Sequence, residues 1–208
     1  MPSNHLATII YLAFLIWAAI LAIGGTAVPE HWRDPLPKVV AAVGWIYLAF
    51  DRWLWKVPVL YPWFVKQPNL HGTFRATLES TWENPNTGNT SDPIEAYFVI
   101  RQRYSRVSVR MFTEESYSAS LAASVSHESD GAWTLIATYQ NTPGPLVLHR
   151  SAPHFGSLLF TSHRRKPFTL EGQYWTSRNT RGAIHITGRS STLFDSFDAA
   201  RTGNYRHS

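Results

Sequence analysis

The sequence predicts an N-terminal hairpin of two transmembrane helices, followed by an all-β, eight-stranded up-and-down antiparallel barrel. Two long apolar runs in residues 1–56 predict the helices, and a change to period-two alternation from residue 70 onward predicts the strands. The 208 residues include no cysteine, which excludes a disulfide scaffold, a thiolate zinc site and a cysteine nucleophile.

The first apolar run extends from Leu6 to Val28 without a charged residue. A transmembrane helix needs about 20 predominantly apolar residues, so this run is long enough. A secretory signal peptide is the alternative, but residues 1–5 contain no Lys or Arg and the apolar core is too long for such a peptide. We therefore expect a transmembrane helix over about residues 6–28.

The second apolar run covers about residues 36–55, and its uninterrupted part, Val39 to Phe50, is short. It spans a bilayer only if Lys38 extends toward one interface while Asp51 and Arg52 lie at the other. A buried core helix or an interfacial helix is the alternative. Because a short loop joins this run to the first one, we expect the two helices to form a membrane hairpin.

The charges that flank the two helices predict their orientation. Arg52, Lys56 and Lys66 follow the second helix, whereas the basic residues of the connecting loop are offset by acidic ones. Positively charged flanks stay on the cytoplasmic side of a membrane. We therefore expect both termini and the barrel to lie in the cytoplasm.

Residues 57–69 form a segment rich in proline and aromatic residues. Pro58, Pro62 and Pro68 prevent a continuous helix here. We expect this segment to be a linker between the helical hairpin and a domain that comprises residues 70–208.

Eight short runs with period-two alternation follow the linker. In the first, Gly72, Phe74, Ala76 and Leu78 share one face. Turn residues separate the runs and no helical pattern lies between them, which excludes a parallel α/β sheet and favours an antiparallel barrel of the kind found in lipocalins and streptavidin. A β-sandwich is the alternative. The C-terminal tail can form a short helix around Phe197.

Composition and motifs argue against nucleic-acid binding and against catalysis. The net charge of +5 is small and is not gathered into a basic stripe, so we expect no DNA or RNA partner, although a small anionic ligand or an anionic membrane surface would suit it. The histidines lack metal-ligand spacing, and no nucleophile elbow or phosphate loop is present. We therefore expect no enzyme, no metal and no cofactor. A membrane enzyme would need a paired acid and base inside the barrel.

The run 170–178, LEGQYWTSR, places unusually polar residues on the face where a core is expected. If Leu170 points inward, Tyr174, Thr176 and Arg178 do so as well. Arg178 can bind a phosphate with two hydrogen bonds, Tyr174 can stack on a base and Thr176 can hydrogen-bond to one. The alternative is that Arg178 ends the strand in solvent and that the tyrosines are ordinary barrel core.

Other polar residues fall in the same inward register. Gln102 ends the apolar face of the run 94–102, and Tyr139 continues the apolar face that begins at Trp133. Serines recur in residues 116–120. We therefore expect five ligand-binding residues, Gln102, Tyr139, Tyr174, Thr176 and Arg178. A lipocalin-like barrel that binds an apolar ligand or lipid from the membrane is the alternative.

The chain resembles the two-transmembrane, β-strand-rich effectors of cyclic-oligonucleotide-based antiphage signalling systems (CBASS). The resemblance covers nearly the whole chain and depends on the order of its features rather than on one catalytic signature. These features are the double helix, the aromatic-proline linker, GTF at 72–74, Gln102, SYSAS at 116–120, Trp133 to Tyr139, HFG at 154–156 and LEGQYWTSR. Phe74 is a departure, because the family pattern has tryptophan there.

The resemblance implies a function that composition does not show. It implies a cyclic dinucleotide as ligand, made by a cognate cGAS/DncV-like nucleotidyltransferase. It also implies that the ligand-bound chain forms homo-oligomers and disrupts the lipid bilayer of the bacterial inner membrane, so that infected cells die before phage is released.

Overall fold

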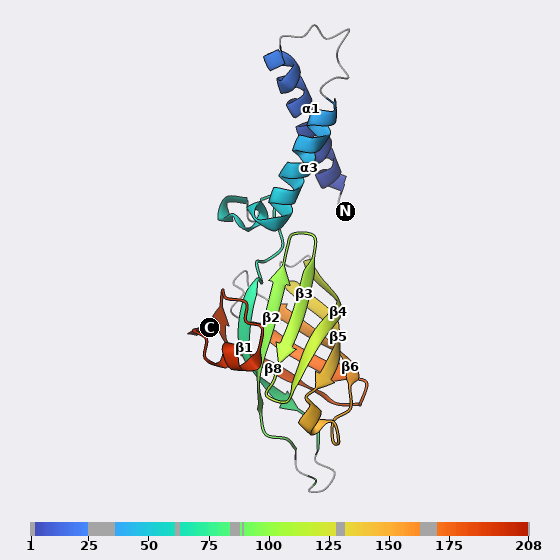
Figure 1. Cartoon of the computed structure of the whole chain (residues 1–208), viewed down its shortest axis with the longest axis vertical. Helices are drawn as coiled ribbons and strands as arrows, with labels where there is room; N and C mark the ends of the chain where they lie inside the picture. The colour runs from blue at the N-terminus through green and yellow to red at the C-terminus, as the bar shows by residue number, and fades with distance from the viewer. Residues whose placement is uncertain are drawn as a thin grey trace. The chain divides into compact units, whose positions relative to one another are not determined.

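The structure, a computed structural model, divides into two compact units, Met1–Val57 and Pro58–Ser208. It describes residues 3–24, 36–60, 63–83, 88, 90–127, 132–162 and 170–207. The first unit contains helices α1 (Ser3–Gly24) and α3 (Leu36–Arg52) and the short helix η1 (Leu54–Lys56). The second unit begins with the short helix η2 (Pro58–Leu60) and continues into the strands (Figure 1).

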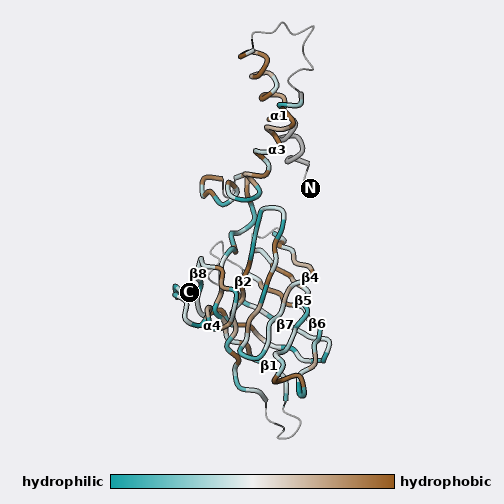
Figure 2. Tube along the Cα trace, viewed as in Figure 1, coloured by the Kyte–Doolittle hydropathy of each residue, from teal (hydrophilic) through white to brown (hydrophobic). Residues whose placement is uncertain are grey.

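The two helices of the first unit pack against each other, with Leu21 and Val39 buried. Large apolar side chains elsewhere on both helices are exposed, among them Tyr11, Phe14 and Trp45. Figure 2 colours much of both helices as hydrophobic.

The prediction that both helices span a membrane is not confirmed. Within the part of the chain that the structure describes, no helix combines the length and the apolar character needed to cross a bilayer. Helix α3 has 17 residues, fewer than the ~20 that a bilayer core requires, and it includes Lys38, Asp51 and Arg52. Residues 25–35, which contain the end of the first expected span and the connecting loop, lie outside the described residues.

The second unit is a closed antiparallel barrel, as the sequence predicts. Each strand pairs with the next along the chain, and an additional pairing of β1 with β8 closes the sheet. This closure distinguishes the barrel from the sandwich alternative. The strands are β1 (Gly72–Ser80), β2 (Ile94–Gln102), β3 (Val107–Phe112), β4 (Ser116–His127), β5 (Trp133–Pro143), β6 (His154–Ser162), β7 (Glu171–Thr176), β8 (Arg181–Ser190) and the short β9 (Arg206–His207), which pairs with β8.

The predicted inward faces form the barrel core. Phe74, Phe98, Trp133 and Phe160 are all buried, and the rings of Phe98 and Phe160 meet edge to face at 5.1 Å. Such aromatic pairs add to the stabilisation that apolar burial provides. Small or aliphatic side chains on the same faces fill the remaining core.

Strand β4 departs from simple alternation. Its register with β5 shifts between Ser120 and Ala122, so that Ser118 points inward before the shift and Ala123 points inward after it. The extra residue, Leu121, is 65% exposed. A bulge of this kind adds one residue to one strand and reverses the face of every residue that follows.

The C-terminal tail covers part of the outside of the barrel. Helix α4 (Phe197–Arg201) is capped by Ser196, whose hydroxyl accepts a hydrogen bond from the Ala199 amide at 3.3 Å. Phe197 and Tyr205 contact the ring of Tyr97 on β2, with ring centroids 5.5 and 5.8 Å apart. The short tail helix that the sequence predicts is therefore present, and it buries an outward-facing aromatic residue.

We expect Gly172→Ala to lower the free energy of unfolding by about 1–3 kcal/mol, the usual cost of overpacking a core. An added Cβ would lie 2.6 Å from the Cβ of Ile184 and 2.7 Å from Cε1 of Phe160. Urea unfolding of the full chain measures the effect. Gln173→Ala, at the exposed neighbouring position, is the matched control, and equal midpoints for the two variants would contradict the expectation.

Candidate functional site

A cavity of about 800 Å³ opens at the end of the barrel where β1, β3, β5 and β7 finish and the even-numbered strands begin. Its volume lies in the range of about 300–1,000 Å³ typical of small-molecule sites. Four of the five predicted ligand-binding residues line it, namely Tyr139, Tyr174, Thr176 and Arg178. The barrel therefore brings together residues from β5, from β7 and from the turn that follows β7.

Glycines on neighbouring strands make room for the two tyrosines. Tyr139 pairs with Gly156, and a Cβ added to Gly156 would lie 2.5 Å from Cζ of Tyr139. Tyr174 pairs with Gly182 in the same way, and the added Cβ would lie 2.6 Å from its Cε1. Each ring thus lies over a glycine, so the position of both rings depends on the absence of a side chain.

Both tyrosines keep their protons at neutral pH. Burial, with a smaller contribution from the neighbouring Tyr174, raises the pKa of Tyr139 to about 12. Burial also raises the pKa of Tyr174, although its hydrogen bond with Ser80 acts in the opposite direction. Two neutral phenols can donate hydrogen bonds and offer aromatic faces without repelling an anion.

Arg178 is held at the mouth of the cavity by a tight turn. Its amide donates to Oγ1 of Thr176 at 3.2 Å, and the next residue, Asn179, has a left-handed φ of 60°. The guanidinium donates from Nη1 to Oγ of Ser151 at 3.2 Å. Among the described residues it has no carboxylate within ion-pair distance, so its charge is available to an anion.

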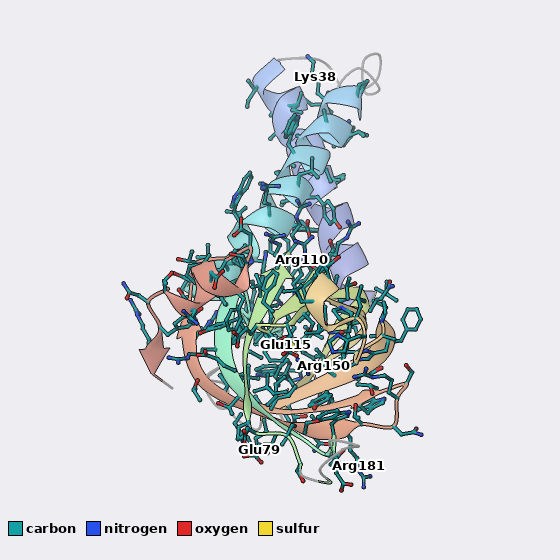
Figure 3. The ribbon with its side chains drawn as sticks, turned by 60° about the horizontal axis from the view of Figure 1, so that its bottom comes forward. Lys38, Glu79, Arg110, Glu115, Arg150 and Arg181 are labelled. Atoms are coloured by element: carbon teal, nitrogen blue, oxygen red, sulfur yellow. The ribbon has the colours of Figure 1, made fainter. Side chains whose placement is uncertain are left out.

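The other charges at the mouth are partly neutralised. Glu115 forms an ion pair with Arg150, and the two lie close together in Figure 3. Glu95 pairs with Arg75 at 2.6 Å. Burial lowers the pKa of His154, and the charge of Arg178 lowers it further, so this histidine is neutral at pH 7. No cluster of His, Asp and Glu among the described side chains is arranged to hold a metal ion.

Asn141 adds a buried amide to the lining. Its Nδ2 donates hydrogen bonds to Oγ of Ser116 and to Oγ of Ser118, both at 3.0 Å. With both N–H groups engaged, the carbonyl oxygen Oδ1 has no hydrogen-bond partner within the described residues and can accept one from a ligand. Of these two serines, Ser116 lines the cavity and Ser118 is buried without lining it.

Gln102, the fifth predicted residue, does not line this cavity. It lies at the far end of β2, where its Oε1 accepts from the Leu70 amide at 2.7 Å and its Nε2 donates to the Pro68 carbonyl at 3.0 Å. The side chain is buried and ties the segment before β1 to the barrel. Inward-facing polar residues therefore have different roles at the two ends of the barrel. At one end Gln102 makes a structural contact, and at the other end such residues line the cavity.

Asn141 and His154 are lining residues that the sequence prediction missed. A signal for both was available, because the alternation that runs from Trp133 to Tyr139 continues to Asn141, and His154 precedes Gly156 by two positions. Arg150 and Ser151 come from the connection between β5 and β6, where no periodic pattern shows which side chains turn toward the mouth.

The comparisons with known proteins point to one receptor family. The family model described as "Cap15, cyclic dinucleotide receptor domain" matches residues 65–188. This match covers all eight strands of the barrel except the last two residues of β8. No curated protein matches the chain.

We expect Gln102→Ala to lower the free energy of unfolding by about 1–3 kcal/mol, because it leaves a buried amide and a buried carbonyl without their partner. Chemical denaturation of the full chain measures this loss. Arg101→Ala, at the adjacent exposed position, should change stability by less than ~0.5 kcal/mol. Equal losses for the two variants would contradict the structural role of Gln102.

We expect the chain to lose stability as the pH rises from 10 to 12. The folded state holds the proton of Tyr139 more tightly than the unfolded chain does, because burial raises its pKa to about 12. This contribution is complete below pH 10 and disappears as the pH passes through 12. Between pH 8 and pH 11.5 the free energy of unfolding, measured by denaturation, should therefore fall more for the wild type than for Tyr139→Phe, which has no phenol to ionise at this position. An equal fall in the free energy of unfolding for both proteins would contradict the raised pKa of Tyr139.

Proposed function

The chain belongs to the Cap15 cyclic dinucleotide receptor family, and on that premise we propose that it is a CBASS effector whose barrel binds a cyclic dinucleotide at its mouth. The observation that carries the site is Arg178, whose guanidinium faces the same cavity as two tyrosines and lacks a carboxylate partner among the described residues. A cyclic dinucleotide has two phosphate charges and two aromatic bases, which match this combination of groups.

In this proposal each kind of group in the ligand meets a matching group of the lining. Arg178, with the hydroxyl of Ser151 beside it, binds a phosphate through charge-assisted hydrogen bonds. Tyr139 and Tyr174 provide flat faces on which bases stack, and Oδ1 of Asn141 accepts a hydrogen bond from a base. The polar mouth disfavours the alternative of a purely apolar ligand, because these groups would lose water without gaining partners.

We further propose that ligand binding leads to homo-oligomers that disrupt the bacterial inner membrane and kill the infected cell. In this proposal the barrel lies in the cytoplasm, where a cognate cGAS/DncV-like nucleotidyltransferase supplies the ligand. The exposed apolar side chains of α1 and α3, among them Tyr11, Phe14 and Trp45, support a membrane-directed role for this unit. Ligand promotes assembly only if the assembled state binds it more tightly.

We expect Arg178→Ala to weaken cyclic dinucleotide binding by roughly 10- to 150-fold, the effect of losing a hydrogen bond to a charged group. Calorimetry with the full chain measures the affinity. Arg181→Ala, which removes the same charge from an exposed position outside the cavity lining, should bind like the wild type. Unchanged affinity in Arg178→Ala would remove Arg178 from the site.

We expect dye to enter bacteria that make the full chain together with an active nucleotidyltransferase. A chain without residues 1–57 should give no dye entry, since the proposed membrane-directed unit is missing, and Arg178→Ala in the full chain should reduce entry. Fluorescence of a membrane-impermeant dye measures the effect. Equal dye entry with an inactive nucleotidyltransferase would contradict ligand control of membrane damage.

A further inference from the structure

Three consecutive strands of the barrel carry no Lys, Arg, Asp or Glu. These are β4, β5 and β6, with 12, 11 and 9 residues. Each of the other strands β1, β2, β3, β7 and β8 contains at least one such residue. One contiguous part of the barrel wall, formed by β4, β5 and β6, therefore has no charged strand residue of these four types.

The outward side chains of these strands form a continuous surface, which we call the uncharged face. It consists of the outward residues of β4, β5 and β6 together with Gln173 and Trp175 of β7. Strand register aligns them in two cross-strand rows, Ser124–Ile136–Leu159–Gln173 and Ala122–Thr138–Ser157–Trp175. Five large side chains of the face are exposed to solvent, namely Tyr117, Leu121, Ile136, Phe155 and Trp175.

The inner side of the same strands lines the ligand cavity. Ser116 of β4, Tyr139 and Asn141 of β5, and His154 and Leu158 of β6 all belong to the lining. A ligand that stacks on Tyr139 therefore contacts strands whose outer side chains form the uncharged face. Only the thickness of one sheet separates the two surfaces.

The lack of charge favours a second copy of this chain as the occupant of the face. Anionic lipid surfaces and nucleic acids are attracted by basic residues, which the three strands do not have. A highly charged protein would find no complementary charges there. In a two-fold contact, each residue near the axis meets its own copy, so a face without charges avoids the repulsion that like charges would cause.

The shape of the face also suits a flat contact. Its central row contains Ala122, Thr138 and Ser157, whose small side chains allow two sheets to approach the ~10 Å at which sheets stack. Trp175 ends this row on β7, Phe155 lies in the neighbouring row, and both provide apolar area.

We propose that two copies of the chain dock face to face through the uncharged face, weakly without ligand and more strongly when the cyclic dinucleotide is bound. This inference depends on the proposed function, which supplies the ligand and the assembly step, and it adds the surface at which copies meet. The ligand favours assembly because its contacts with β4, β5 and β6 fix the strands that present the face.

Opposite charges at one exposed position test the contact. Ile136→Glu and Ile136→Lys should each weaken ligand-dependent assembly of the full chain by at least tenfold in protein concentration, because each charge meets its own copy. An equimolar mixture of the two variants should recover assembly. Analytical ultracentrifugation measures the assembly, and Ser108→Glu, on the outer side of β3, should behave like the wild type. Full assembly of each Ile136 variant alone would overturn the proposal.

Two further measurements separate this inference from the proposed function. Calorimetry at protein concentrations too low for assembly should show that the Ile136 variants bind ligand like the wild type, whereas an absence of heat in the wild type would remove the proposed function and not the face. Because the chain has no cysteine, Thr138→Cys can crosslink only to its own copy under mild oxidation. At high protein concentration it should crosslink at least tenfold faster than Ser108→Cys, with or without ligand.

Equal crosslinking rates at the two positions would overturn the proposal even if no ligand binds. Flotation with vesicles of anionic lipid tests the alternative that the uncharged face binds a lipid surface. If both Ile136 variants lose vesicle binding while their assembly is unchanged, the face contacts lipid and not a second copy.

Discussion

The pairing of β1 with β8 is the constraint on which the rest of the structure depends. It joins the first and last long strands, from Thr73 opposite Ser190 to Ser80 opposite Gly182. Without this pairing the sheet would have two long edges, and the inward face would be open to water. With it, one set of alternate residues encloses a core and the mouth cavity, and the other set faces outward.

Because the barrel is closed, the inward side chains of neighbouring strands must fit together, and this packing positions the tyrosines of the site. The rings of Tyr139 and Tyr174 occupy the space that Gly156 and Gly182 leave on the adjacent strands. Gly172 serves the core in the same way, because Phe160 fills the space beside it. The glycine in the inward run 170–178 therefore admits a core side chain, and does not bring the backbone close to a ligand.

Polar groups at the mouth are arranged so that the charge of Arg178 remains available to an anion. The ion pair of Glu115 with Arg150 and the neutral state of His154 leave Arg178 as the cation beside the tyrosines. The same strands that line this cavity present an uncharged outer side. Ligand recognition and the proposed contact between copies thus use opposite faces of one part of the wall.

An antiparallel all-β domain, its strand order and most of its inward residues could be predicted from the sequence, because period-two alternation and turn residues are local signals. Tyr139, Tyr174, Thr176 and Arg178 could be predicted as cavity residues for that reason. The position of Gln102 at the other end of the barrel could not be predicted in this way, since alternation gives the face of a strand residue but not the groups that form hydrogen bonds with it. Closure into a barrel and not a sandwich depends on the pairing of β1 with β8, which are distant in the chain. Where the β4–β5 register shifts and which loop side chains reach the mouth also depend on contacts between segments distant in the chain.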